Sequence, residues 1–185
     1  MKRRKWLWLA LLLGLSNVSQ AAPATRGLIY IDPQEYTHEI KLWHFYYGYW
    51  FSQGEAVEPI ALAALQPLFA ETAMCEGNEA GDVVVWIKPK MFYNPHMTTF
   101  YGKIMARVYS GSGKLIGQYK GEAQNTGFLD VYPEYKVQAT YAAAMRKVVQ
   151  QMKNDAALQG VLDKGVPESE TRMPCSMVSI LPDVK

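Results

Sequence analysis

The sequence predicts an α+β fold: a two-layer sandwich in which two main helices cover one face of an antiparallel β-meander. Two observations predict it. Three strand-like segments follow one another across short turns, and two other segments carry apolar residues at helical spacing. Helices that flank a meander and carry one apolar stripe should pack on one face of its sheet. The expected order is β-β-α-β-β-β-α, in a single domain over residues 22–165 followed by an irregular tail over 166–185.

Residues 1–21 have the three-part pattern of a cleavable signal peptide. A basic start precedes the apolar run Trp6–Leu15, and small or polar residues follow it. Ser19 and Ala21 suit the −3 and −1 positions, so cleavage is expected after Ala21. The alternative is a membrane anchor, but a membrane-spanning helix needs about 20 apolar residues and this run has about half that number.

The leader predicts the compartment and changes the charge of the chain. No cysteine stands directly after the apolar run, so we expect a soluble, non-lipidated periplasmic protein without a transmembrane segment after cleavage. The leader removes four basic groups, which leaves 15 basic against 17 acidic residues. A nearly neutral chain gives no reason to expect binding to nucleic acid.

The two cysteines of the chain are Cys75 and Cys175. In an oxidising compartment such a pair predicts a disulfide, which would tie the tail to the domain. Two free thiols or a shared metal ion are the alternatives. A metal site is disfavoured because no Cys or His lies at ligand spacing from either cysteine.

The first half of the chain contains two expected strands and one expected helix. The strands are Gly27–Ile31, a β-branched run before a turn, and Thr37–Phe45, whose side chains alternate. Ala56–Cys75 has helical spacing. Pro59 suits its first turn, whereas Pro67 predicts a kink or a division into two short helices.

The second half contains the meander and the longest helix. Asp82–Lys88 is apolar almost throughout, which predicts a strand buried on both faces. Thr98–Tyr109 alternates and leads through a Ser-Gly hairpin loop into the strand Leu115–Ala123. Glu134–Lys153 has a single apolar stripe, and a short helix over Ala156–Leu162 follows it.

The most unusual feature is an aromatic cluster in residues 43–51. Rigid rings give a large contact area at low entropic cost, so the cluster would suit a ligand or partner. The alternative is that the rings pack into the core and under the tail, although an extended segment cannot turn all of them inward. The cluster contains Trp43, Phe45, Tyr46, Tyr47, Tyr49, Trp50 and Phe51, and the candidate binding residues are Trp43, Tyr46, Tyr47, Tyr49, Trp50 and Phe51.

The three histidines are the first candidates for a metal site. The extended chain between His38 and His44 spans about 20 Å, so these two cannot share one ion without a bend, and sequence does not place His96. The chain has no GxSxG, HExxH or phosphate-loop motif. We therefore expect no catalytic residue, no metal, no cofactor and no enzymatic activity.

The element order over Ala56–Lys153 resembles that of the proteobacterial lipoproteins that assist ABC-type transport. Those proteins combine a strand–helix opening with an antiparallel meander and a closing helix. The resemblance implies an envelope accessory role. It rests on element order, matches no motif residue by residue and assigns no functional residues. This chain also lacks the lipidation cysteine of that group.

The leading hypothesis is a non-enzymatic periplasmic accessory or adaptor protein. It would bind another envelope component through an exposed sheet edge and the aromatic cluster. A second hypothesis is a glycan- or peptidoglycan-binding module that stacks sugars on Trp43, Tyr47 and Trp50. A hydrolase whose active site assembles from distant residues is the third.

Overall fold

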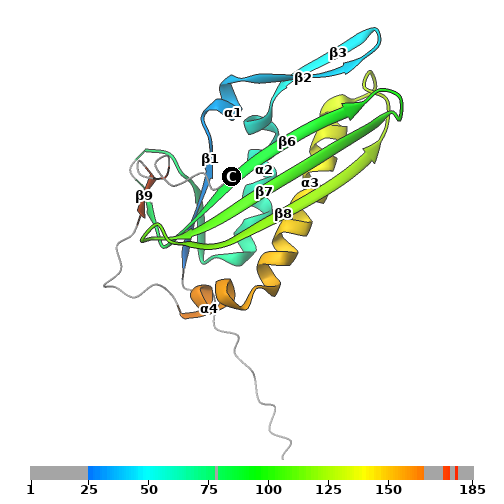
Figure 1. Ribbon diagram of the computed structural model, residues 1–185. Coiled ribbons are helices and arrows are strands. Elements are labelled where there is room, and N and C mark those ends of the chain that lie inside the picture. The colour runs from blue at the N-terminus through cyan, green and yellow to red at the C-terminus, as the bar shows by residue number, and fades with distance from the viewer. Residues whose placement is uncertain (1–24, 78, 165–172, 176–177, 179–185) are drawn as a thin grey trace, which may run out of the picture.

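The computed structural model describes residues 25–77, 79–164, 173–175 and 178. Figure 1 shows the α+β arrangement expected from the sequence, with α2 and α3 behind one face of a five-stranded sheet. The signal peptide expected over 1–21 and most of the tail lie outside the described residues. The main sheet consists of β1 Arg26–Ile31, β4 Glu71–Met74, β6 Val83–Asn94, β7 Thr99–Ser110 and β8 Leu115–Thr126.

The predicted meander is confirmed as β6, β7 and β8. Neighbouring strands are antiparallel, and β6 and β8 extend further than expected because their pairing with β7 continues the ladder. The apolar run Val83–Ile87 is buried throughout, as its lack of alternation predicted.

The other half of the sheet is parallel, so an antiparallel meander describes only part of it. The strand order is β4-β1-β6-β7-β8, and β1 runs parallel to both β4 and β6. Parallel neighbours need a crossover connection. Here α1 Gln34–Thr37, a hairpin and α2 Gln53–Leu65 lie between β1 and β4.

The helix expected over Ala56–Cys75 is wrong in its second half. After α2 come η1 Gln66–Leu68, which contains Pro67, and then β4. The last residues of the expected helix form β4 and pair with β1. The hydrogen bonds of this pairing override the helical spacing. Because α2 begins at Gln53, Pro59 lies in the helix interior instead of the first turn.

The core lies between the sheet and the helices. The expected closing helices are confirmed as α3 Pro133–Asn154 and α4 Ala156–Lys164. The apolar stripe of α3 packs against β7 and β8. A Cβ at Gly121 would collide with the carbonyl oxygen of Ala144, so this glycine lets α3 approach the edge strand closely.

Side chains of α3 cover the outer edge of β8. Lys136 Nζ donates to the carbonyl oxygen of Thr126 over 3.1 Å, and Lys147 Nζ donates to that of Glu122 over 2.6 Å. Gln151 accepts from the amide of Lys120 and donates to its carbonyl. Occupied backbone groups cannot pair with another strand, so this edge is closed where these bonds form.

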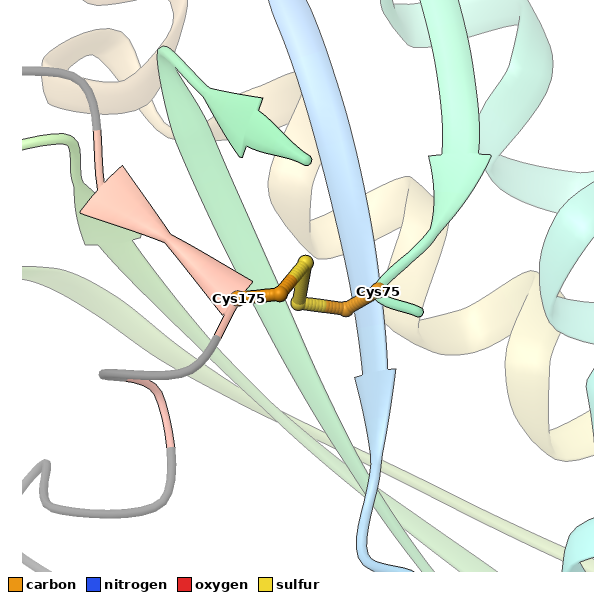
Figure 2. The surroundings of a disulfide bond; sticks show 2 residues. All are labelled: Cys75 and Cys175. Carbon is orange, nitrogen blue, oxygen red and sulfur yellow. A yellow bond between two sulfur atoms is a disulfide. The ribbon is translucent and has the colours of Figure 1, made fainter. Parts of the chain in front are cut away.

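The predicted disulfide joins Cys75, which directly follows β4, to Cys175 (Figure 2). The residues before Cys175 form the short strand β9 Met173–Pro174, which pairs with β5 Ala80–Gly81. Around the bond lies a second apolar cluster, on the face of the sheet away from the helices. Its buried members are Leu28, Tyr30, Val84, Trp86, Tyr109, Cys175 and Val178.

The disulfide bears on the cellular compartment. Structural disulfides persist outside the reducing cytoplasm, so the bond fits an exported protein. Among the described residues, no helix is both long and apolar enough to cross a bilayer.

Candidate functional site

The aromatic cluster lies in a separate β-hairpin that projects beside the main sheet (Figure 1). Its strands are β2 Glu39–His44 and β3 Tyr47–Ser52, joined by Phe45 and Tyr46. The strand expected over Thr37–Phe45 is thus present but belongs to the hairpin. The second strand was not anticipated, because aromatic residues interrupted by one glycine show no alternation.

The two faces of the hairpin differ. Leu42 and Phe51 are buried and turn toward the core, with half-buried Tyr49 beside them. Trp43 and Trp50 occupy the opposite face, where Lys41 Nζ lies 5.2 Å from the centre of the Trp50 ring. Of the seven aromatics, core packing therefore accounts for Phe51 and, in part, Tyr49.

The three residues of the glycan hypothesis do not share one face. Tyr47 pairs directly with His44, and directly paired residues in an antiparallel ladder point to the same side. Trp43 neighbours His44 along the strand and therefore points to the other side. The sequence placed Trp43, Tyr47 and Trp50 together only by their proximity along the chain.

The hairpin tip contacts the turn between β6 and β7. The ring centroids of Phe45 and His96 lie 5.1 Å apart, and those of His44 and Tyr93 lie 6.4 Å apart. The ring centroids of His44 and Phe45 lie 5.2 Å apart, so His44 and His96 flank Phe45. His38 precedes β2 at the far end of the hairpin. The described part of the chain contains no group of three or more potential metal-ligating side chains.

A third segment, the loop between β8 and α3, joins the same end. The Gly127 amide donates to the carbonyl oxygen of Thr98 over 2.7 Å, and Tyr93 Oη donates to that of Gly127 over 3.2 Å. The beginning of α3 lies beside the hairpin, where Tyr49 and Trp50 line a depression with Glu134. Burial, and then the charge of Glu134, raise the pKa of Tyr49.

These segments expose a set of large apolar side chains that we call the aromatic end. Tyr46 is 98% exposed and Trp50 is 55% exposed. Among the described large apolar side chains that are exposed, only Leu115, at 37%, lies elsewhere, at the start of β8. The aromatic end comprises Trp43, Phe45, Tyr46, Tyr47, Trp50, Phe92, Met97, Phe128, Val131, Tyr132 and Tyr135.

The backbone is strained at this end. Among the described residues, two that are not glycine have a positive φ. These are Thr98, with φ 44°, and Tyr132, with φ 49°. This left-handed conformation is uncommon for side chains other than Asn and Asp, and it concentrates at functional sites. Thr98 lies in the β6–β7 turn and Tyr132 immediately precedes α3.

An acidic depression of about 390 Å³ lies between the hairpin and helices α2 and α3. Glu39, Glu55 and Glu134 contribute carboxylates to its lining, and Trp50 forms part of the wall. The depression lies next to exposed apolar side chains, so this end combines hydrophobic contact with negative charge.

Comparisons with known proteins give little similarity. No protein-family model matches the sequence, and no curated protein matches it. Among solved structures, one similar chain is a "putative lipoprotein" from Caulobacter crescentus CB15, with 12% sequence identity and a TM-score of 0.34. The match covers 57% of this chain and 81% of that one. A TM-score this low supports no conclusion about function.

Proposed function

We propose that this exported protein is a non-enzymatic accessory of the bacterial cell envelope that docks on a protein partner through the aromatic end. The observation that carries the proposal is the gathering of exposed large apolar side chains from several segments at one end of the molecule. A gathering of exposed apolar side chains is a feature of interaction sites. Tyr, Trp, Phe and Met are also the residue types enriched in protein interfaces.

The partner is expected to present an apolar segment with basic side chains. The apolar part would cover the rings of the hairpin and the β8–α3 loop. A Lys or Arg side chain would enter the depression lined by Glu39, Glu55 and Glu134. Such charge complementarity adds specificity and speeds association more than it adds affinity.

Two features favour the aromatic end over a sheet edge. Lys136, Lys147 and Gln151 already occupy backbone groups on the edge of β8. The opposite edge strand, β4, has only four residues and leads directly into the disulfide. A role in assisting transport, implied by the resemblance in element order, belongs to this proposal.

A glycan module on the hairpin is the weaker alternative. Lys41 lies over the Trp50 ring in a cation–π contact, so one face of that ring is already covered. Trp43 and Tyr47 point to opposite sides. A sugar would have to displace Lys41 to stack on that face of Trp50.

Site-specific crosslinking in cells tests the proposal. A photoreactive amino acid at Tyr46 is expected to capture one defined envelope protein, because this side chain is nearly fully exposed at the hairpin tip. The same probe at Leu115, exposed at the opposite end, is the matched control and should not capture it. Trp50→Ala in the Tyr46 probe strain should reduce the crosslink at least fivefold.

Three outcomes would overturn the proposal: no protein adduct at Tyr46, an equal adduct at Leu115, or an adduct indifferent to Trp50→Ala. Crosslinking to lipid alone would assign the aromatic end to a membrane surface and would also overturn it. Circular dichroism of the purified variants checks that each one folds.

A further inference from the structure

A second surface lies on the outer face of the main sheet, the face away from α2 and α3. Cross-strand pairing places side chains in two adjacent rows, Phe92–Tyr101–Gln124 and Lys90–Lys103–Glu122. A depression of about 750 Å³ lies over these rows, and we call it the lysine groove. Its defining residues are Lys90, Phe92, Tyr101, Lys103, Glu122 and Gln124.

The groove holds cations in an arrangement that costs stability. Lys90 and Lys103 are directly opposite on neighbouring strands, where like charges repel. Within the described residues, neither lysine has a carboxylate at ion-pair distance. Glu122 instead pairs with Lys120 on its own strand, Nζ to Oε1 2.6 Å. Lys147 extends from α3 past the edge of β8, where its Nζ donates to the Glu122 carbonyl oxygen, and it adds a third ammonium group to the lining.

The groove also offers an aromatic wall and polar groups. Phe92 is 60% exposed and its ring centroid lies 5.9 Å from that of Tyr101. The Tyr101 hydroxyl donates a hydrogen bond to Met97 Sδ over 3.5 Å. The Glu122 carboxylate accepts hydrogen bonds, and the Gln124 amide both donates and accepts them. Gln124 lies in the same row as the aromatic wall, and Glu122 lies in the neighbouring row on this face of the sheet.

We propose that the lysine groove binds an acidic saccharide. The apolar face of a sugar ring would lie on Phe92 and Tyr101, and its carboxylate or phosphate would lie between Lys90 and Lys103. The sugar hydroxyls would bond to Glu122 and Gln124. This combination of rings, paired cations and hydroxyl partners fits an acidic sugar better than a bare inorganic anion, which Glu122 would repel.

The position of Glu122 within the cationic row supports this assignment. The hydrogen bond from Lys120, and then the charges of Lys120, Lys103 and Lys147, lower the pKa of its carboxyl group. Glu122 is therefore ionised at neutral pH and acts as an acceptor for hydroxyl groups. A ligand that brings only negative charge meets both attraction and repulsion in the groove, whereas an acidic sugar satisfies both kinds of group.

Calorimetric titration of the mature protein tests the proposal. The probes are a galacturonic acid trisaccharide, glucose 1-phosphate, inorganic phosphate and a neutral maltotriose control. The expected result is saturable binding of at least one acidic saccharide and at least tenfold weaker binding of inorganic phosphate and maltotriose. The uronate and phosphate arms identify which acidic group the lysines prefer. Affinity should fall as salt concentration rises.

Matched variants locate the binding. The double variant Lys90→Gln/Lys103→Gln should weaken saccharide binding at least tenfold. Lys114→Gln/Lys164→Gln removes the same charge elsewhere and should change it less than twofold. Phe92→Ala should weaken binding without altering its salt dependence. Thermal unfolding verifies that these surface variants remain folded.

The proposal is overturned if neither acidic saccharide binds, if maltotriose binds as well, or if both lysine double variants bind alike. Lysine-dependent binding to anionic phospholipid vesicles in place of saccharide would also overturn it. The result is separable from the proposed docking function, because Trp50→Ala should leave saccharide binding intact and Lys90→Gln/Lys103→Gln should leave the Tyr46 crosslink intact.

Discussion

The two halves of strand β6 meet different surroundings on the outer face of the sheet. In the first half, Val84 and Trp86 are buried in the cluster that contains Cys175 and Val178. In the second half, Lys90 and Phe92 are exposed beside the lysine groove. The opposite face of the strand packs into the main core in both halves. The side chains on the outer face of a strand are thus apolar where a second segment covers them, and they include charged residues where none does.

The largest expected effect comes from removing the disulfide that holds the covering segment against the first half of β6. The double variant Cys75→Ser/Cys175→Ser should lose about 4–5 kcal/mol of unfolding free energy, because the bond closes a loop spanning a sequence separation of 100 residues. Equilibrium urea unfolding measures the loss, and reduction of the wild-type protein should reproduce it. A loss below about 1 kcal/mol would show that the bond constrains the unfolded chain little.

Two aromatic truncations on the same strand and face compare the halves directly. Trp86→Ala should cost about 3–5 kcal/mol, since Trp86 is only 9% exposed and its removal leaves a cavity. Phe92→Ala should cost less than about 0.5 kcal/mol because the ring lies mostly in solvent. Denaturant midpoints give both values. Equal losses would contradict the division of the outer face.

A smaller effect concerns the pKa of Glu122, which lies in the lysine groove beside the exposed half of β6. Glu122 should titrate below the ordinary value of 4.5, chiefly because Lys120 donates a hydrogen bond to its carboxylate. A lowered folded-state pKa stabilises the fold above the unfolded-state value, and this contribution is lost as the pH falls through the folded-state value. Carbon-13 NMR of the carboxyl group follows the titration. Lys120→Gln should raise the midpoint, and an unchanged midpoint would refute the stated cause.

The smallest expected change is a slight stabilisation. Lys90→Gln removes the repulsion from Lys103 directly opposite, and should raise the unfolding free energy by no more than about 0.5 kcal/mol. The gain should disappear in 1 M salt, where charges are screened within about 3 Å. Thermal melts at low and high salt measure it. Destabilisation at low salt would mean that Lys90 contributes packing that outweighs the repulsion.

Local patterns were sufficient to predict the meander, α3 and the disulfide. The run Val83–Ile87 even indicated that something covers its outer face. The parallel pairing of β1 with β4 and β6 was not predictable, because it depends on the path of the chain through α2. The helix expected to reach Cys75 failed for the same reason, since β4 gains its hydrogen bonds from a strand some 45 residues earlier.

The candidate surfaces were predictable to different degrees. The density of rings in residues 43–51 already indicated exposure. The contributions of Phe128 and Tyr132 required the loop geometry that brings Gly127 against Thr98. The lysine groove was not predicted, because Lys90 and Lys103 become neighbours only through the register of β6 and β7. Lys90 also lies beyond the strand expected over Asp82–Lys88, so no pairing with Lys103 was expected.

The long separation between Cys75 and Cys175 has a consequence for the biogenesis of the protein. At the usual synthesis rate of about 5–20 residues per second, the second cysteine is made about 5–20 s after the first. During that interval the Cys75 thiol has no intramolecular partner, because the chain has only two cysteines. In a chain exported as it is synthesised, correct maturation therefore requires an oxidation pathway that either leaves this early thiol reduced or holds it reversibly until its partner arrives.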